Sequence, residues 1–143
     1  MSENRKTLID VSIRQTWHRI ARMYNQKALS LDMTMSVGFI LMYVEIKGSP
    51  STSLGPRMGM EPTSLSRTLK TMESQGLIRR EVSVEDKRKV LIFLTSKGVE
   101  KRRMVREFLL DFNKMIDDKL SKKAKESFYE TISTIDELTQ KID

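Results

Sequence analysis

The chain has 143 residues, a formal net charge of +7 and no cysteine. This length suits one domain with a sizeable core, and the lack of cysteine excludes disulfides, thiol-based redox sensing and Cys-ligated zinc or iron–sulfur sites. We expect no cofactor, no metal and a cytoplasmic location. The N-terminus is polar, without the apolar segment of a signal peptide, and no apolar run approaches the roughly 18 residues of a membrane span.

The positive charge is concentrated in the middle of the chain. Residues 57–103 contain twelve Lys and Arg against six Asp and Glu. Residues 1–56 contain seven against four, and residues 104–143 contain seven against nine. A basic segment of this kind suits a polyanionic partner, although a solvated basic face explains the charge alone equally well.

Helical periodicity marks the first two elements. Apolar residues recur at helical spacing from Leu8 to about Ala28, which predicts an amphipathic helix. Thr34 is placed to cap a second helix, which we expect to be buried nearly all round and to end at Gly48.

Two short helices that begin with proline come next. Ser49-Pro50 predicts the first, with a hydroxyl N-cap followed by proline at the first helical position, and Gly59 ends it. Glu61-Pro62 predicts the second, which Gly76 closes. Two short helices joined by a tight turn are the skeleton of a helix-turn-helix.

After Gly76 the period changes to that of strands. RREVSV and VLIFL predict a β-hairpin with a charged tip at residues 85–89. Thr95 then caps a long helix that ends near Leu120, and Ser121 caps a last helix. The predicted fold class is mainly α, with about six helices and a two-stranded β-wing.

Four stretches of the chain resemble the MarR (multiple antibiotic resistance regulator) family of bacterial transcription factors. They are LGPRMGM at 54–60, the segment 61–80, Asp86-Lys87-Arg88, and LTSKG at 94–98. In order and spacing they are similar to the family's first helix-turn-helix segment, its recognition helix, its D-x-R wing signature and the LT-x-x-G after the wing.

The resemblance implies a winged helix-turn-helix protein that acts as a homodimer. Within a single domain, 1–143, residues 30–95 would form the DNA-binding lobe, and the helices at 1–29 and 96–143 would hold two copies together. The apolar stripes of these terminal helices are more than a small lobe could easily cover. The partner would be double-stranded DNA with a pseudo-palindromic operator, its half-sites about one helical turn apart.

The second helix of the helix-turn-helix has the side chains that a major groove admits. Short polar groups at its start allow close approach, and longer cations reach further. We expect Arg67 to pair with guanine and Lys70 to reach a backbone phosphate. The polar side chains expected to bind phosphates or base edges are Thr63, Ser64 and Ser66.

The wing is the second expected contact. An arginine at a hairpin tip can enter a narrow minor groove, where negative potential is concentrated. We expect Arg88 to do so, with Lys87 and Lys89 on phosphates. Asp86 cannot favour DNA by its charge, and we expect it to hold the tip in shape by pairing with Arg88 or Arg67.

Gly55-Pro56 departs from the family pattern. These residues lie inside the first helix of the helix-turn-helix, where the family has good helix formers. Proline removes one amide donor and kinks or shortens a helix. We therefore expect this helix to be irregular.

The resemblance also implies that a small ligand releases the DNA by binding between the dimer helices and the lobe. The side chains able to line such a cleft are Trp17, His18, Arg22, Met35, Phe39, Met42 and Tyr43. Ordinary core packing and surface exposure explain the same residues equally well.

These features predict a sequence-specific DNA-binding transcriptional regulator, a repressor released by a small ligand. The alternative is a winged-helix module that binds protein and not DNA. Such a module would not need Arg67, Lys70 and Arg88 on one surface, and its binding would vary little with salt. We do not expect an enzyme, because the chain has one histidine and neither a Gly-rich phosphate loop nor an HExxH or paired-carboxylate signature.

Overall fold

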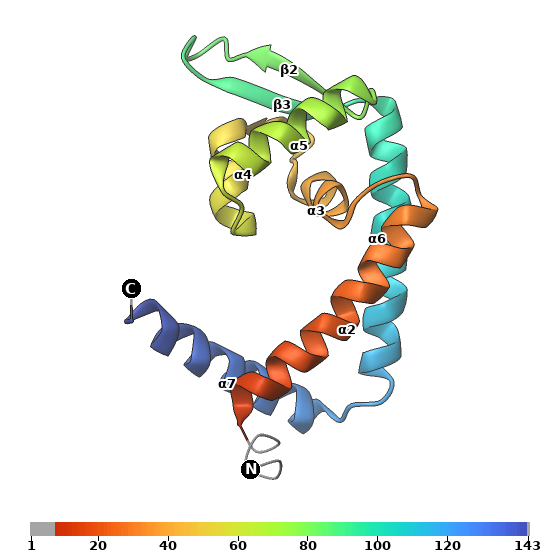
Figure 1. The fold of residues 1–143 in the computed structure, drawn as a ribbon, viewed down its shortest axis with the longest axis vertical. Helices are drawn as coiled ribbons and strands as arrows, with labels where there is room; N and C mark the ends of the chain where they lie inside the picture. Colours follow the sequence, from red (N-terminus) through yellow and green to blue (C-terminus); the bar gives the residue numbers. More distant parts are fainter. Residues whose placement is uncertain (1–7, 143) are drawn as a thin grey trace. The chain divides into compact units, whose positions relative to one another are not determined.

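The computed structural model describes residues 8–142 as parts of two compact units, Met1–Arg106 and Glu107–Asp143 (Figure 1). The elements in chain order are α2 (Ile9–Ser30), α3 (Met35–Tyr43), β1 (Ser49–Pro50), α4 (Ser51–Met58), α5 (Pro62–Ser74), β2 (Ile78–Val82), β3 (Val90–Leu94), α6 (Ser96–Asp117) and α7 (Lys122–Gln140). The predicted fold class, mainly helical with a β-wing, is confirmed.

The core of the first unit is built around α3. The Thr34 hydroxyl accepts a hydrogen bond from the Val37 amide at 3.2 Å, which is the predicted N-cap. Most side chains of α3 are buried or half-buried, as predicted. The largest fully buried side chains are Ile40, Leu41, Val44, Leu54, Leu69, Met72 and Ile92. They come from α3 and its C-cap residue and from α4, α5 and β3, so the helix-turn-helix and the sheet share one core.

The second helix is shorter than predicted. α3 ends at Tyr43, so the prediction that Gly48 ends this helix is wrong. Gly48 lies in the following turn with φ +95°, where its amide donates to the Glu45 carbonyl at 2.9 Å. A Cβ on Gly48 would lie 2.7 Å from the Phe93 ring. Glycine therefore lets this turn pass close against β3.

Ser49 and Pro50 do not begin a helix, so this prediction is also wrong. They form β1, which pairs antiparallel with β3 through Ser49 and Ile92, and α4 begins one residue later at Ser51. The buried Ser49 hydroxyl accepts a hydrogen bond from the Glu45 amide at 2.9 Å. Because Pro50 has no amide proton to donate, it suits a short edge strand. The sheet consequently has three strands, in the order β1-β3-β2.

The helix with the internal proline is continuous from Ser51 to Met58. It ends in a turn where the Met60 amide donates to the Gly55 carbonyl at 3.0 Å, and Gly59 takes a φ of +63°. A Cβ on Gly55 would lie 3.1 Å from the Met60 carbonyl and 3.3 Å from Leu65 of α5. Glycine at this position therefore allows α4 and α5 to approach closely.

Three cationic side chains of α6 bind the ends of three other helices. Lys97 donates to the Gln75 carbonyl at 2.8 Å, Lys101 to the Leu31 carbonyl at 2.6 Å, and Arg102 to the Val44 carbonyl at 3.1 Å. Gln75, Leu31 and Val44 are the C-cap residues of α5, α2 and α3. Cations are favourable there, because the last carbonyls of a helix lack intrahelical donors and carry partial negative charge.

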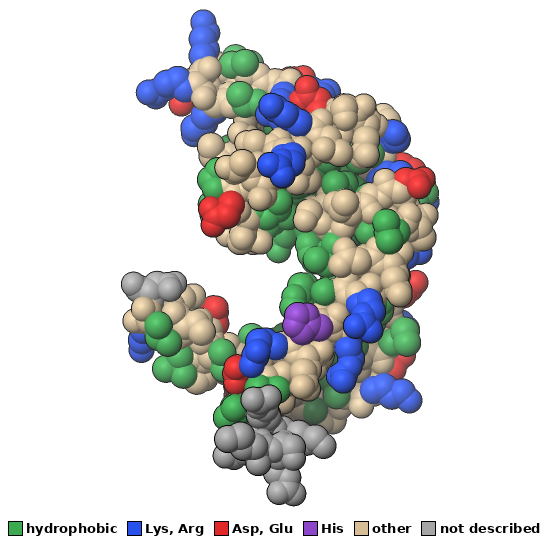
Figure 2. Space-filling view, in the orientation of Figure 1, with side chains coloured by type: hydrophobic (Ala, Val, Ile, Leu, Met, Phe, Trp, Pro, Cys, Tyr) green, Lys and Arg blue, Asp and Glu red, His purple; other side chains and the backbone are tan. Residues whose placement is uncertain are grey.

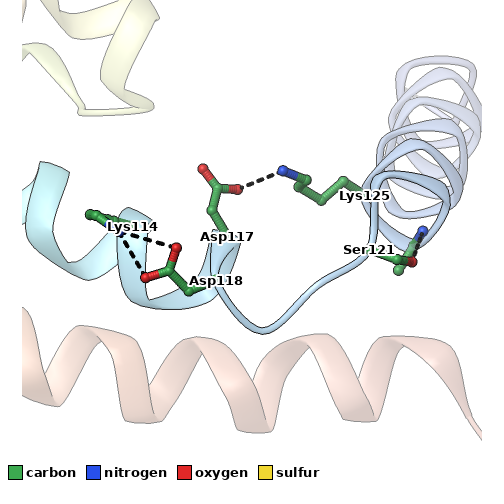
Figure 3. Close-up of polar contacts among 6 residues, drawn as sticks. Lys114, Asp117, Asp118, Ser121 and Lys125 are labelled. Atoms are coloured by element: carbon green, nitrogen blue, oxygen red, sulfur yellow. Dashed lines mark hydrogen bonds and ion pairs between the residues drawn. The ribbon is translucent and has the colours of Figure 1, made fainter.

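The second unit contains the corner between α6 and α7 (Figure 3). α6 ends at Asp117, a little before the predicted end near Leu120. Lys125 of α7 pairs with Asp117 at 3.3 Å, and Lys114 pairs with Asp118 at 2.9 Å. The Ser121 hydroxyl accepts from the Ala124 amide at 3.1 Å, as the predicted N-cap should.

α7 carries an apolar stripe that its own unit leaves exposed. No residue of this helix is buried. Its exposed large apolar side chains are Phe128, Tyr129, Ile132 and Leu138, and Ile142 follows the helix. An exposed stripe of this size is typical of a helix that packs against another chain.

The close contact at the start of α6 predicts that Gly98→Ala is destabilising. A Cβ on Gly98 would lie 2.1 Å from the Leu77 carbonyl oxygen, so main chain must shift. We expect a loss of about 1–3 kcal/mol in the free energy of unfolding, measured by urea denaturation. Gly38→Ala in α3 is the control, because its Cβ would meet side chains only at 3.8 Å and beyond. If both variants unfold at the same urea concentration, the close contact is unimportant.

Candidate nucleic-acid interface

The second helix of the helix-turn-helix, α5, has one buried and one exposed face. Proline stands at its start after the N-cap Glu61. Leu65, Leu69 and Met72 recur every three or four residues and are buried in the core. This spacing turns the polar side chains at the start of the helix outward. The exposed residues from Thr63 to Lys70 are Thr63, Ser64, Ser66, Arg67 and Lys70.

A shallow groove runs along the exposed face of α5. Pro62, Thr63, Ser66, Arg67 and Lys70 line it. The structure thus brings four of the five α5 residues singled out in the sequence to one surface. Ser64 is exposed but does not line this groove.

The cations of this groove differ from the neighbouring arginines in their ionic partners. Among residues 8–142, neither Arg67 nor Lys70 forms an ion pair. Arg80 pairs with Glu73 at 2.5 Å. Arg79 pairs with Glu81, and its guanidinium lies 4.5 Å from the centre of the Phe93 ring. The groove therefore presents positive charge that no nearby carboxylate neutralises.

The hairpin tip is folded around one aspartate. The Asp86 carboxylate accepts hydrogen bonds from the Arg88 main-chain amide at 3.0 Å and from its Nε at 3.3 Å. Across the base of the loop, the Ser83 amide donates to the Lys89 carbonyl, and the Lys89 amide donates to the Asp86 carbonyl, both at 2.9 Å. Of the two arginines considered as partners of Asp86, this structure pairs it with Arg88.

These hydrogen bonds also change the acidity of Asp86. The Arg88 main-chain amide, followed by the Arg88 side chain, holds the pKa of Asp86 below its ordinary value. A carboxyl group with a lowered pKa stays charged even at pH values where an ordinary aspartate becomes protonated. It loses its charge, and with it these bonds, only when the pH falls through the lowered pKa. The Asp86–Arg88 pair is therefore intact at neutral pH.

The cations of the tip point away from the core. The Arg88 side chain is 91% exposed despite its bond to Asp86, and Lys87 and Lys89 are exposed as well. Figure 2 shows Lys and Arg side chains gathered around the hairpin loop and over α5 on the same face of this unit. The structure therefore places both predicted contact regions on one face.

The residues considered for a ligand cleft lie on α2 and α3. Trp17 packs edge-on against Tyr24, with ring centres 6.4 Å apart, and Tyr24 packs in the same way against Phe39 at 5.9 Å. Tyr43 instead contacts Arg57 of α4, which lies 5.0 Å from its ring centre. His18 and Arg22 are exposed, and Met35 and Met42 are half-buried.

Sequence reasoning missed the residues that hold the end of α5. Lys97 and Thr95 bond to the main chain that follows this helix. Thr95 was identified only as a helix cap, and Lys97 only as part of the LTSKG stretch. Their partners are main-chain carbonyls. Every residue has one, so residue types do not indicate which carbonyl will be bound.

The described part of the chain lacks the features of a metal site and of a membrane span. Between residues 8 and 142, no cluster of three or more His, Asp or Glu side chains is arranged to hold a metal ion. Nor does any helix in that range have the length and apolar character needed to cross a membrane.

Comparison with known proteins gives a consistent result. The family model described as MarR family matches residues 34–90. No curated protein matches the chain. Similar solved structures include the Staphylococcus aureus MepR–DNA complex, which has 20% sequence identity and a TM-score of 0.81 and covers 90% of this chain and 96% of that chain.

Two other structures show the same similarity of fold. The MarR family transcription regulator SP03579 has 18% identity and a TM-score of 0.81, over 90% of this chain and 86% of that chain. MepR of S. aureus, described as a transcription regulator of the multidrug efflux pump MepA, has 19% identity and a TM-score of 0.69, over 90% and 96%. The MarR family model thus covers α3, the helix-turn-helix and most of the wing, and the solved structures show that the chain shares the fold of MarR-family regulators.

Proposed function

We propose that this protein is a sequence-specific DNA-binding transcriptional regulator, a repressor that acts as a homodimer in the bacterial cytoplasm. The observation that carries the proposal is the exposed face of α5. There Thr63, Ser66, Arg67 and Lys70 share one groove, and the two cations have no ionic partner among the described residues. Free cations beside short hydroxyl side chains are what a helix needs to bind in the major groove.

In this proposal α5 enters the major groove with its N-terminal end foremost. Thr63, Ser64 and Ser66 allow close approach and bind phosphates or base edges. Arg67 presents its planar guanidinium to the two acceptors of a guanine, and Lys70 binds a backbone phosphate. The dipole of α5 places partial positive charge at the same end and favours the phosphates further.

The wing binds the adjacent minor groove. Arg88 is held by Asp86 at its main-chain amide and at Nε, which leaves its two terminal nitrogens to face a groove. Lys87 and Lys89 bind the phosphates on either side. Asp86 thereby orders the arginine although its own charge opposes DNA.

A second copy of the chain covers the apolar stripe of α7. Phe128, Ile132 and Leu138 are at least 37% exposed in one copy, which is costly for large apolar side chains on one helix face. The exposed apolar residues near the start of α2, among them Ile9 and Ile13, would contribute to the same kind of contact. Two lobes related by a twofold axis suit a pseudo-palindromic operator.

Release by a small ligand requires unequal affinity of that ligand for the DNA-binding and non-binding states. The residues proposed to bind it are Trp17, His18, Arg22, Met35, Phe39, Met42 and Tyr43. The edge-on aromatic cluster of Trp17, Tyr24 and Phe39 supports an aromatic or apolar ligand, and the exposed Arg22 supports an anionic group on it.

Arg67→Ala and Arg88→Ala test the two DNA contacts. With a duplex enriched from random DNA, we expect Arg67→Ala to weaken binding by about 1–3 kcal/mol and to relax specificity at one base pair. Arg88→Ala should weaken binding to most sequences. It should also lower the salt slope, which is the steepness with which the logarithm of the affinity falls with the logarithm of the salt concentration, by about 1 for each wing bound. Fluorescence anisotropy at several salt concentrations measures both effects.

Lys123→Ala is the control for these variants, because it removes an exposed cation from α7. We expect it to bind the duplex as the wild type does. If the double variant of Arg67 and Arg88 binds the same duplex with wild-type affinity at physiological salt, the proposed function is wrong, and a protein-binding module becomes the better explanation.

Two substitutions at Asp86 separate its charge from its hydrogen bonds. Asp86→Ala removes the acceptor that holds Arg88, so we expect weaker DNA binding. Asp86→Asn keeps an acceptor for the Arg88 amide and removes a negative charge that repels DNA, so we expect binding equal to or tighter than that of the wild type. Tighter binding by both variants would show that Asp86 acts by charge alone and not by ordering the wing.

The dimer is tested by a charge in the α7 stripe. Ile132→Glu places a carboxylate in the proposed contact, and we expect a monomer by sedimentation equilibrium and far weaker operator binding. Lys123→Glu adds a carboxylate at an exposed position about two and a half turns before Ile132, and therefore on the opposite face of α7, and should leave the dimer intact. A dimeric Ile132→Glu variant would place the contact elsewhere.

A further inference from the structure

Three consecutive carbonyls after α5 are all bound by the start of α6. Lys97 Nζ donates to the Gln75 carbonyl at 2.8 Å, and the Thr95 hydroxyl donates to the Gly76 carbonyl at 2.5 Å. The Thr95 amide donates to the Leu77 carbonyl at 3.0 Å. We call residues 75–77 together with 95–98 the latch.

The turn that ends α5 explains why these carbonyls need donors. Gly76 has a φ of +72°, and its amide donates to the Glu73 carbonyl at 3.0 Å. The Leu77 amide donates to the Met72 carbonyl at 2.9 Å. This is the Schellman arrangement, in which these amides donate to carbonyls in the last turn of the helix. It provides no donors for the carbonyls of the residues that form the turn itself.

Thr95 uses both properties of a hydroxyl. Its oxygen accepts from the Gly98 amide at 3.1 Å and so caps α6, while its proton goes to Gly76. Gly98 completes the latch, because any Cβ there would overlap the Leu77 carbonyl. The end of α5 is thus bound to the beginning of α6 by hydrogen bonds and by close contact.

The opposite end of α5 carries the proposed DNA contacts. A helix of 13 residues is about 20 Å long. A tilt of about 5° at its C-terminal end would therefore move its N-terminal end by nearly 2 Å. Hydrogen bonds to base edges tolerate a much smaller displacement, whereas a lysine on a flexible stem can follow a phosphate.

We propose that Lys97 and Thr95 are positioning residues for DNA sequence recognition, which they support by fixing the pose of α5 without touching the DNA. This inference rests on the proposed function. The latch is needed for base-specific contacts from Thr63, Ser66 and Arg67. It is not needed for the charge attraction that supplies nonspecific binding.

Lys97→Met is the variant that tests the latch. Methionine keeps an apolar stem of similar length and removes the ammonium, and Lys97, unlike Thr95, is not the N-cap of α6. Substitution of Thr95 is less informative, since it would also remove the cap of α6. Lys97→Arg restores a cationic donor, and Lys123→Met removes an exposed lysine from α7 as the matched control.

The experiment measures the affinity of each variant for two duplexes, one enriched from random DNA and one unrelated, at several salt concentrations. For Lys97→Met we expect the ratio of the two affinities to fall about tenfold, with an unchanged salt slope and nearly unchanged nonspecific binding. Lys97→Arg should recover most of the ratio, and Lys123→Met should keep it. A general loss of folded protein would lower both affinities equally and leave the ratio alone.

Hydrogen exchange of the free protein gives a second measurement. In Lys97→Met we expect faster exchange of the amides of α5 than in the wild type, and wild-type exchange in α7. Unchanged exchange in α5 would overturn the inference even if DNA binding were weaker.

The remaining outcomes separate the latch from the function on which it rests. If the wild type prefers the enriched duplex and Lys97→Met does so equally, the latch has no role in recognition. If Lys97→Met loses both affinities together with one unit of salt slope, Lys97 is a phosphate contact and the inference is wrong. A wild type that binds both duplexes equally would contradict the proposed function itself, and the role of the latch with it.

Discussion

The first unit depends on the donors that α6 presents to the carbonyl ends of other helices. Three helices end with their C-caps at Gln75, Leu31 and Val44, where partial negative charge accumulates. Lys97, Lys101 and Arg102 bind these three carbonyls from a single helix. α6 is therefore the common support on which α2, α3 and α5 are positioned, and the pose of α5 is the one on which the proposed DNA contact depends.

Around α5, the arginines that form ion pairs are separate from the cations that line the groove. Arg79 and Arg80 have carboxylate partners, and Asp86 is bound to Arg88. Arg67 and Lys70 have no such partner among residues 8–142 and line an open groove. A cation that is already paired would lose that partner on binding a phosphate, whereas an unpaired one loses only water. This difference explains why α5, and not the equally basic start of β2, is a proposed contact surface. At the wing tip Arg88 is paired with Asp86 only through its main-chain amide and Nε, so its terminal nitrogens are left for DNA.

The parts of the fold that depend on neighbours in sequence could be predicted, and the parts that depend on distant partners could not. Thr34, Thr95 and Ser121 cap helices as their local patterns indicate. Whether Ser49-Pro50 caps a helix or pairs with a strand is decided by β3, more than forty residues away in the sequence, so a local rule gave the wrong answer. The exposed face of α5 follows from helical spacing alone. The latch does not, because its acceptors are main-chain carbonyls.

The central claim is that α5 and the wing recognise a DNA sequence. Selection from random duplex DNA, followed by sequencing of the bound fraction, tests it most directly. The proposal predicts enrichment of a pseudo-palindrome whose half-sites lie about one helical turn apart, as two lobes of a symmetric dimer require. Bound DNA with no more sequence in common than the starting pool would contradict it.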